Sequence, residues 1–101
     1  MAVNAPASGA WRPGDDPGGR RFATLFTAEP LVLELGGTLS PVEVAYQTWG
    51  EPDSGGANAV LVAHALTGDS HAAGPAGPGH RQPGWWDAMI GPGRGIDTER
   101  W

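Results

Sequence analysis

The chain has 101 residues, of which 17 are Gly and 10 are Pro, whereas Leu, Ile, Val and Phe together number only 17. This composition excludes a helical bundle, a coiled coil and a large independent core, because those structures need many more large apolar side chains. The formal net charge of −5 argues against nucleic acid and anionic membranes as partners, since both require clustered positive charge. The chain is therefore expected to be either largely disordered or part of a larger protein.

Cysteine is absent, so the chain can form no disulfide, thiolate nucleophile or cysteine zinc site. Residues 1–14 lack the basic start and the apolar core of a signal peptide. No stretch approaches the roughly 20 consecutive apolar residues that cross a membrane. We therefore expect a cytoplasmic protein that has no membrane partner.

Two regions are predicted along the chain. Residues 1–27 are expected to be a disordered or loosely attached tail, because small residues, Gly and Pro dominate its first 21 positions and provide no hydrophobic face. Trp11 has no supporting apolar residues there, so its side chain is expected to be unfixed. Residues 28–101 are expected to be the folded region.

Two short strands are predicted at the start of the folded region. Residues 31–35 alternate in the way that is typical of a strand, and Gly36 and Gly37 follow as a turn signal. Residues 42–49 also alternate, with Glu43 and Gln47 on the face opposite Val42. This second pattern predicts an antiparallel strand with one solvated face.

The next two segments are predicted to be a buried strand and a short helix. Residues 58–66 are almost continuously apolar, which favours a strand covered on both faces in a parallel sheet. Such a strand needs helices above and below it, and the chain does not supply them, so we expect it to be incomplete. Residues 84–90 could form about two helical turns that end at Gly91.

The candidates for catalytic and metal-binding residues are the polar residues after this apolar run. Asp69, Ser70 and His71 are the residue types of a hydrolytic triad, but three consecutive residues cannot align as hydroxyl, imidazole and carboxylate. His64, His71 and His80 match no common zinc spacing, so we predict no metal and interpret them as residues bonded to neighbours.

Two further features have a plain structural interpretation. Residues 91–95 (GPGRG) could present backbone N–H groups and Arg94 to a phosphate, but no nucleotide-binding motif is present and a turn is favoured. The pair Trp85 and Trp86 could form the wall of a pocket, but packing is the commoner use of Trp.

The junction at residues 64–68 (HALTG) is the most informative site. In open α/β sheets, ligands bind where strands end, and in one large class of enzymes the loop after the third strand donates a backbone N–H to an oxyanion hole. Gly68 provides the backbone freedom that such a turn needs. A plain strand exit explains these residues equally well.

Five stretches resemble a known family: residues 44–50 (VAYQTWG), 58–74 (NAVLVAHALTGDSHAAG), 83–87 (PGWWD), 90–93 (IGPG) and 96–98 (IDT). In order and spacing they closely resemble the N-terminal part of homoserine O-acetyltransferase. The resemblance covers about residues 30–101 and implies an α/β fold. The chain would be the N-terminal part of an α/β-hydrolase fold, with the first strands of the central sheet and an active-site loop.

The resemblance implies a two-step acyl transfer in methionine biosynthesis. A serine takes the acetyl group from acetyl-CoA, and the hydroxyl of L-homoserine then takes it from the enzyme. The backbone N–H of Leu66 matches the position that helps to form the oxyanion hole, and Thr67, Gly68 and Asp69 are candidates for substrate binding. The resemblance implies acetyl-CoA as a co-substrate, no bound cofactor, and a homodimeric full-length protein.

The family's nucleophile has no counterpart in this sequence. Ser8, Ser40, Ser54 and Ser70 all lack the glycine-flanked context of a nucleophile elbow, and the triad Asp and His are not assigned to any residue here. We therefore expect the chain alone to be inactive. Four alternatives stay open: a succinyl donor, a serine acceptor, a hydrolase of the same fold, and a non-catalytic homologue that binds acyl-CoA or a partner.

Overall fold

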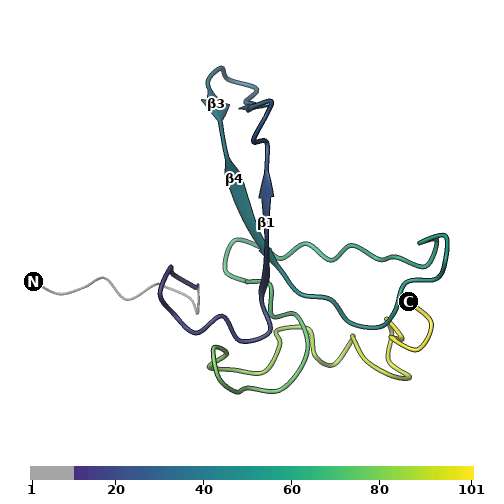
Figure 1. Cartoon of the computed structure of the whole chain (residues 1–101). Coiled ribbons are helices and arrows are strands. Elements are labelled where there is room, and N and C mark those ends of the chain that lie inside the picture. The colour runs from purple at the N-terminus through teal and green to yellow at the C-terminus, as the bar shows by residue number, and fades with distance from the viewer. Residues whose placement is uncertain (1–10) are drawn as a thin grey trace, which may run out of the picture.

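The regular structure consists of four short β-strands in a computed structural model that describes residues 11–101. They are β1 (Arg21–Leu25), β2 (Leu31–Val32), β3 (Thr38–Leu39) and β4 (Val42–Tyr46). β1 pairs with β4, and β2 with β3, each antiparallel (Figure 1). The described part contains no helix, and hence none that could span a membrane.

The strands form an arm that projects from a base of irregular loops (Figure 1). The Cα radius of gyration is 16.0 Å, larger than the ~13 Å expected of a compact domain of about 100 residues. The buried core is correspondingly small. It consists of Ala72, Ala73 and Ile90 in the base, against which Trp49, Val62 and Ile96 pack.

The predicted antiparallel strand at residues 42–49 is confirmed for its first five residues. β4 ends at Tyr46, and its partners in β1 include Phe22 opposite Ala45. The expectation of a single solvated face is wrong, because Val44 and Tyr46 are themselves 41% and 38% exposed. Nothing in the described chain forms a second layer over this two-stranded sheet.

The strand predicted at residues 31–35 is shorter than expected. β2 ends at Val32, because the chain turns at once: the Gly36 N–H donates to the Leu33 carbonyl, and the Leu33 N–H to the Gly37 carbonyl. Gly36 and Gly37 have φ values of 89° and 84°, which confirms the predicted turn. Leu35 lies at the tip of this turn and is fully exposed.

The predicted tail is wrong where β1 lies. Residues 1–10 of that region fall outside the described residues, but Arg21–Leu25 forms a five-residue ladder with β4. Trp11 is also placed, with its ring 4.7 Å from that of Phe22. Composition missed β1 because a ladder between segments about 20 positions apart depends on the partner strand, which a local count of apolar residues does not include.

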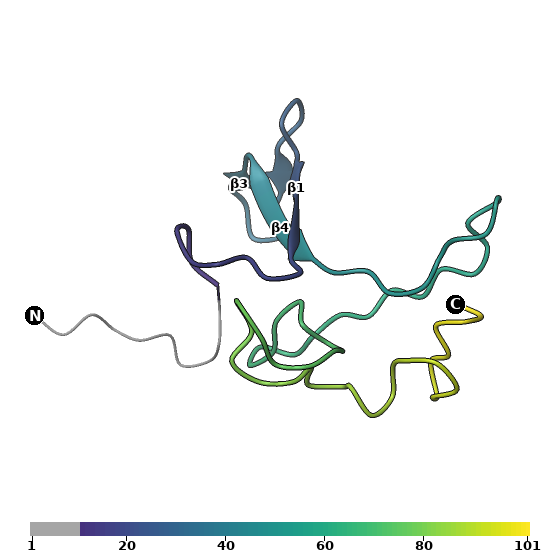
Figure 2. The same ribbon diagram turned by 60° about the horizontal axis from the view of Figure 1, so that its bottom comes forward.

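Residues 58–66 do not form the predicted buried strand. They follow an extended, irregular path beyond β4 (Figures 1 and 2), and no backbone hydrogen bond among the described residues involves positions 59–64. Leu61 and Leu66 are 95% and 99% exposed. The apolar pattern is compatible with a strand, but a strand also requires a partner, and none of residues 11–101 lies in register beside it.

Residues 84–90 form consecutive turns and not the predicted helix. Only the Ile90 N–H makes an α-helical bond, to the Trp86 carbonyl at 3.3 Å, whereas Asp87 and Met89 donate to carbonyls three residues earlier. The N–H groups of Trp85 and Trp86 instead donate to the carbonyls of His71 and Ala72. The segment is thus bonded to the loop at residues 71–74, through N–H groups that would lack a partner in the first turn of a helix.

Candidate functional site

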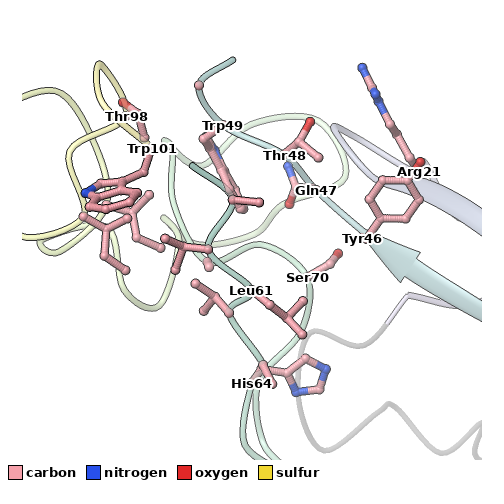
Figure 3. A pocket seen from close by; sticks show the side chains of 18 of the residues that line it. Arg21, Tyr46, Gln47, Thr48, Trp49, Leu61, His64, Ser70, Thr98 and Trp101 are labelled. Carbon is pink, nitrogen blue, oxygen red and sulfur yellow. The ribbon is translucent and has the colours of Figure 1, made fainter. Parts of the chain in front are cut away.

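A cavity of about 880 Å³ separates the end of β4 from the extended run that follows it. Figure 3 shows its lining, which includes Tyr46, Thr48, Trp49, Leu61, His64, Ser70, Thr98 and Trp101. These residues come from four segments of the chain. Most of the named side chains are apolar or aromatic, which is the usual composition of a small-molecule site.

The turn at residues 65–68 follows directly on the lining residue His64. The Gly68 N–H donates to the Ala65 carbonyl at 2.9 Å, and His64 Nδ1 donates to the same oxygen at 2.6 Å. A Cβ atom on Gly68 would lie 2.9 Å from the Cβ of His64, so this close turn requires glycine. The sequence predicted Gly68 for its backbone freedom, whereas the structure gives it no positive φ and shows that the close contact is what favours glycine.

Leu66 occupies the exposed corner of this turn. Its side chain is 99% exposed, and no hydrogen bond among the described residues uses its backbone N–H. A donor without an internal partner can bind a ligand oxygen without first breaking a bond to the protein. The adjoining Thr67 is also exposed.

Asp69 makes internal hydrogen bonds with each of its oxygen atoms. Oδ2 lies 3.0 Å from the Arg20 guanidinium, and Oδ1 accepts the His71 N–H at 2.9 Å. The Asp69 carbonyl accepts the indole N–H of Trp85, also at 2.9 Å. Sequence reasoning proposed Asp69 for substrate binding but missed Arg20, because nothing near Arg20 in the sequence indicates a partner 49 positions away.

His71 and His80 stack face to face, with ring centroids 3.7 Å apart and planes at 11°. The ring nitrogens of buried His71 lie 3.1 Å from Gln47 Oε1 and from the Pro75 carbonyl oxygen. His80 Nε2 accepts the Gly19 N–H at 3.0 Å, which requires an unprotonated nitrogen. Burial, and then the nearby charges of His71 and Arg20, lower the pKa of His80.

These contacts agree with the interpretation of the histidines as residues bonded to neighbours. The third histidine, His64, is exposed and donates to the Ala65 carbonyl. Residues 11–101 hold no group of three or more metal-ligating side chains.

The rejection of a local triad agrees with the geometry of residues 69–71. The Asp69 carboxylate accepts the backbone N–H of His71, whereas the His71 ring contacts other partners. Ser70 Oγ is buried, lines the cavity and has no hydrogen-bond partner in the described part of the chain. The hydroxyl, imidazole and carboxylate are therefore not aligned for catalysis.

The GPGRG segment is a plain turn, as predicted. The Arg94 guanidinium donates to the carbonyls of Asp87 and Ile90 and lies 3.4 Å from the Asp87 carboxylate. The Gly93 N–H donates to Asp97 Oδ1 at 3.0 Å. These groups, which could have bound a phosphate, are already paired within the protein.

The tryptophan pair packs as predicted. The rings of Trp85 and Trp86 stack with centroids 5.7 Å apart and planes at 13°. Their exposed fractions are 43% and 40%, and Trp85 also lines the cavity. Packing and a place in the cavity wall, which we treated as alternatives, therefore coexist in Trp85.

The chain is similar in sequence and structure to enzymes that act on acyl groups. It is 59% identical to homoserine O-acetyltransferase from Thermobifida fusca over 96 residues, which are 95% of this chain and 25% of that protein. Its structure matches esterase E22 with a TM-score of 0.70 and 32% identity, covering 81% of this chain and 22% of the esterase. No protein-family model matches.

A second solved structure with a similar fold is itself a homoserine O-acetyltransferase. Homoserine O-acetyltransferase from Bacillus anthracis matches with a TM-score of 0.68 and 34% identity, over 81% of this chain and 21% of that one. The arrangement is thus that of part of an α/β-hydrolase-type enzyme, although the described residues provide only its strands and loops. Over the length that it spans, the chain is similar to curated proteins named homoserine O-acetyltransferase, at 57–59% identity. It spans about a quarter of the length of the curated relatives it matches.

Proposed function

We propose that this chain forms part of an acyltransferase that moves an acetyl group from acetyl-CoA to the hydroxyl of L-homoserine, in cytoplasmic methionine biosynthesis. The 59% identity to the Thermobifida fusca enzyme is the observation that carries the proposal. The described geometry supports it, because the turn at residues 65–68 adjoins a cavity of about 880 Å³ and presents an unused N–H. The relatives' names support homoserine as the acceptor.

The proposed reaction has two balanced steps. A serine hydroxyl supplied by the rest of the enzyme bonds to the thioester carbon, its proton passes to a base, and CoA leaves as the thiol. The homoserine hydroxyl then bonds to the same carbon, gives its proton to the base, and displaces the serine oxygen, which regains a proton. Each step passes through a tetrahedral intermediate that has a negatively charged oxygen.

Within this reaction, the chain contributes part of the oxyanion hole. The Leu66 N–H would donate to the charged oxygen, and one such donor lowers the barrier by about 3 kcal/mol. Thr67 and Gly68 would contact substrate beside it. The chain holds no cofactor in this scheme, acetyl-CoA acts as a co-substrate, and the complete enzyme is proposed to be a homodimer.

Hydrolysis is the second candidate, and the match to esterase E22 favours it. The two functions share the acyl-serine step and differ only in the acceptor, because water takes the place of the homoserine hydroxyl. The same oxyanion hole would serve both reactions.

A graft separates the two functions. In this graft, the present chain replaces the 96 matching residues of the Thermobifida fusca enzyme. CoA release from acetyl-CoA is measured with and without L-homoserine, and the product is identified by mass spectrometry. We expect release that depends on homoserine and yields O-acetylhomoserine, whereas release without homoserine would indicate a hydrolase.

Two controls complete the test. The parent enzyme shows that the assay works, and the chain alone is expected to be inactive. A graft that folds like its parent but catalyses neither reaction would contradict the proposed function. Replacing acetyl-CoA with succinyl-CoA, and homoserine with serine, tests the remaining alternatives for donor and acceptor.

A further inference from the structure

Arg20 is the most deeply buried charged side chain that the structure describes. Only 2% of its side chain is exposed, and its guanidinium donates to the Gly79 carbonyl at 2.8 Å, the Pro17 carbonyl at 3.2 Å and Asp69 Oδ2 at 3.0 Å. A charge is buried at a cost unless its hydrogen bonds are satisfied, so these three acceptors hold the guanidinium in one position.

The contact between Arg20 and Asp69 joins two distant parts of the chain. The segment that contains Gly18 packs tightly on the loop at Gly79, since a Cβ atom on Gly79 would lie 2.5 Å from the Gly18 nitrogen. Asp69, 49 positions after Arg20, follows directly on the turn at residues 65–68. The position of Asp69 is therefore set by a residue that lies just before β1.

Hydrogen bonds to distant residues hold the turn on this side only, whereas on the other side Val62 packs against the core. Before it, positions 59–64 make no backbone hydrogen bond within the described chain. After it, Asp69 is bonded to Arg20, to the His71 N–H and to the Trp85 indole. Three hydrogen bonds on one adjoining residue thus fix where the turn lies.

We infer that Arg20 is a positioning residue for the turn at residues 65–68. Through Asp69, Arg20 holds this turn so that the Leu66 N–H faces the acyl carbonyl. The inference rests on the proposed function. An oxyanion donor acts only when it is aimed at the developing charge, and misplacement by about 1 Å can cost roughly 100-fold in rate. Arg20 itself touches no substrate.

The test uses the graft with Arg20→Met, Arg20→Lys and Asp69→Asn. Arg81→Met is the matched control, because Arg81 is exposed and makes no hydrogen bond or ion pair within the described residues. For each variant, kcat and KM are measured per active enzyme, counted by the acyl-enzyme burst. Hydrogen exchange of the backbone at residues 65–68 is measured in parallel.

We expect Arg20→Met to lower kcat by about 10- to 100-fold with KM changed less than twofold, since the lost interaction acts in the transition state. Arg20→Lys should recover part of kcat, because Lys retains one charge contact but not the forked donors. Asp69→Asn combined with Arg20→Met should lower kcat no further than Arg20→Met alone. Exchange at residues 65–68 should accelerate in Arg20→Met and not in Arg81→Met.

A purely structural role predicts different results. In that case Arg20→Met lowers the thermal midpoint but leaves kcat per active enzyme and exchange at residues 65–68 unchanged, which would overturn the inference. If the unmutated graft is folded but inactive, the proposed function fails, and the exchange experiment still decides whether Arg20 positions the turn. If Arg20→Met does not fold, Arg20→Lys and Asp69→Asn provide the same comparison.

Discussion

Replacing Gly84 with Ala tests how closely the two segments of the base pack together. A Cβ atom at position 84 would lie 2.3 Å from both the nitrogen and the Cα of Ala73, and 2.5 Å from the Ala72 carbonyl carbon. Carbon atoms in contact are normally about 3.5–4.0 Å apart, so the two backbones must separate by more than 1 Å. The clashing atoms belong to the main chain, so no side-chain rotation relieves the contact.

The cost follows from the bonds that this separation would stretch. The Gly84 N–H donates to the Gly74 carbonyl at 2.9 Å, and the Trp86 N–H to the Ala72 carbonyl at 2.8 Å. Overpacking costs about 1–3 kcal/mol and each weakened hydrogen bond about 1 kcal/mol. We expect Gly84→Ala to lower the unfolding free energy of the graft by about 3–5 kcal/mol.

Urea unfolding followed by tryptophan fluorescence measures this difference. Gly77→Ala is the matched control, because a Cβ atom at Gly77 would meet no atom within 4 Å. The control is expected to change the unfolding free energy by less than about 0.5 kcal/mol. Equal stability of the two variants would refute the packing of residues 71–74 against residues 84–86.

Three further predictions concern single groups in the graft. The pKa of His80 lies below its ordinary value of 6.5, so the unfolded chain binds more protons than the folded chain as the pH falls. The stability that His80 contributes should be full above about pH 6.5 and should fall as the pH drops toward the folded pKa. Thermal midpoints across pH 5–8 should show this dependence in the graft and not in His80→Gln. An unchanged pH dependence in His80→Gln would contradict this assignment. The Gly74 N–H, and then Arg94, hold the pKa of Asp87 below its ordinary value of 3.8. Asp87→Asn should therefore lower the thermal midpoint at pH 7, and by less and less as the pH falls below 3.8. An effect of equal size at every pH would count against these contacts. Leu66→Pro removes the proposed oxyanion donor and should lower kcat by about 100- to 1,000-fold at an unchanged thermal midpoint, whereas activity within threefold would argue against the donor.

The parts of the fold that could be predicted are those that depend on local sequence patterns. β4 and the turn at Gly36 and Gly37 follow from local patterns, because alternation and positive-φ glycines act within a few residues. The run at residues 58–66 has the composition of a buried strand, yet neither partner nor covering layer is present among the described residues. A pattern can indicate that a segment suits a strand, but hydrogen bonding requires another segment.

In the candidate site, too, some features could be predicted from local sequence and others could not. The junction at residues 64–68 could be singled out from the sequence, because an apolar run ends there in a glycine turn. The contact between Arg20 and Asp69 could not, since it joins residues 49 positions apart and gives no periodic signal. The stacking of His71 on His80 and the packing of Gly84 on Ala73 were hidden for the same reason.

By itself, then, the sequence determined the acidic charge, the scarcity of large apolar residues, the alternation of β4, and the ordered motifs that resemble homoserine O-acetyltransferase. Only the tertiary structure decided that β1 lies in the predicted tail and that Arg20 is buried beside Asp69. It also decided that residues 84–90 form consecutive turns bonded to a neighbouring loop, and not a helix. The physical reason is that charge, turn preference and periodicity are local, whereas strand pairing and the burial of a charge depend on residues that only folding brings together.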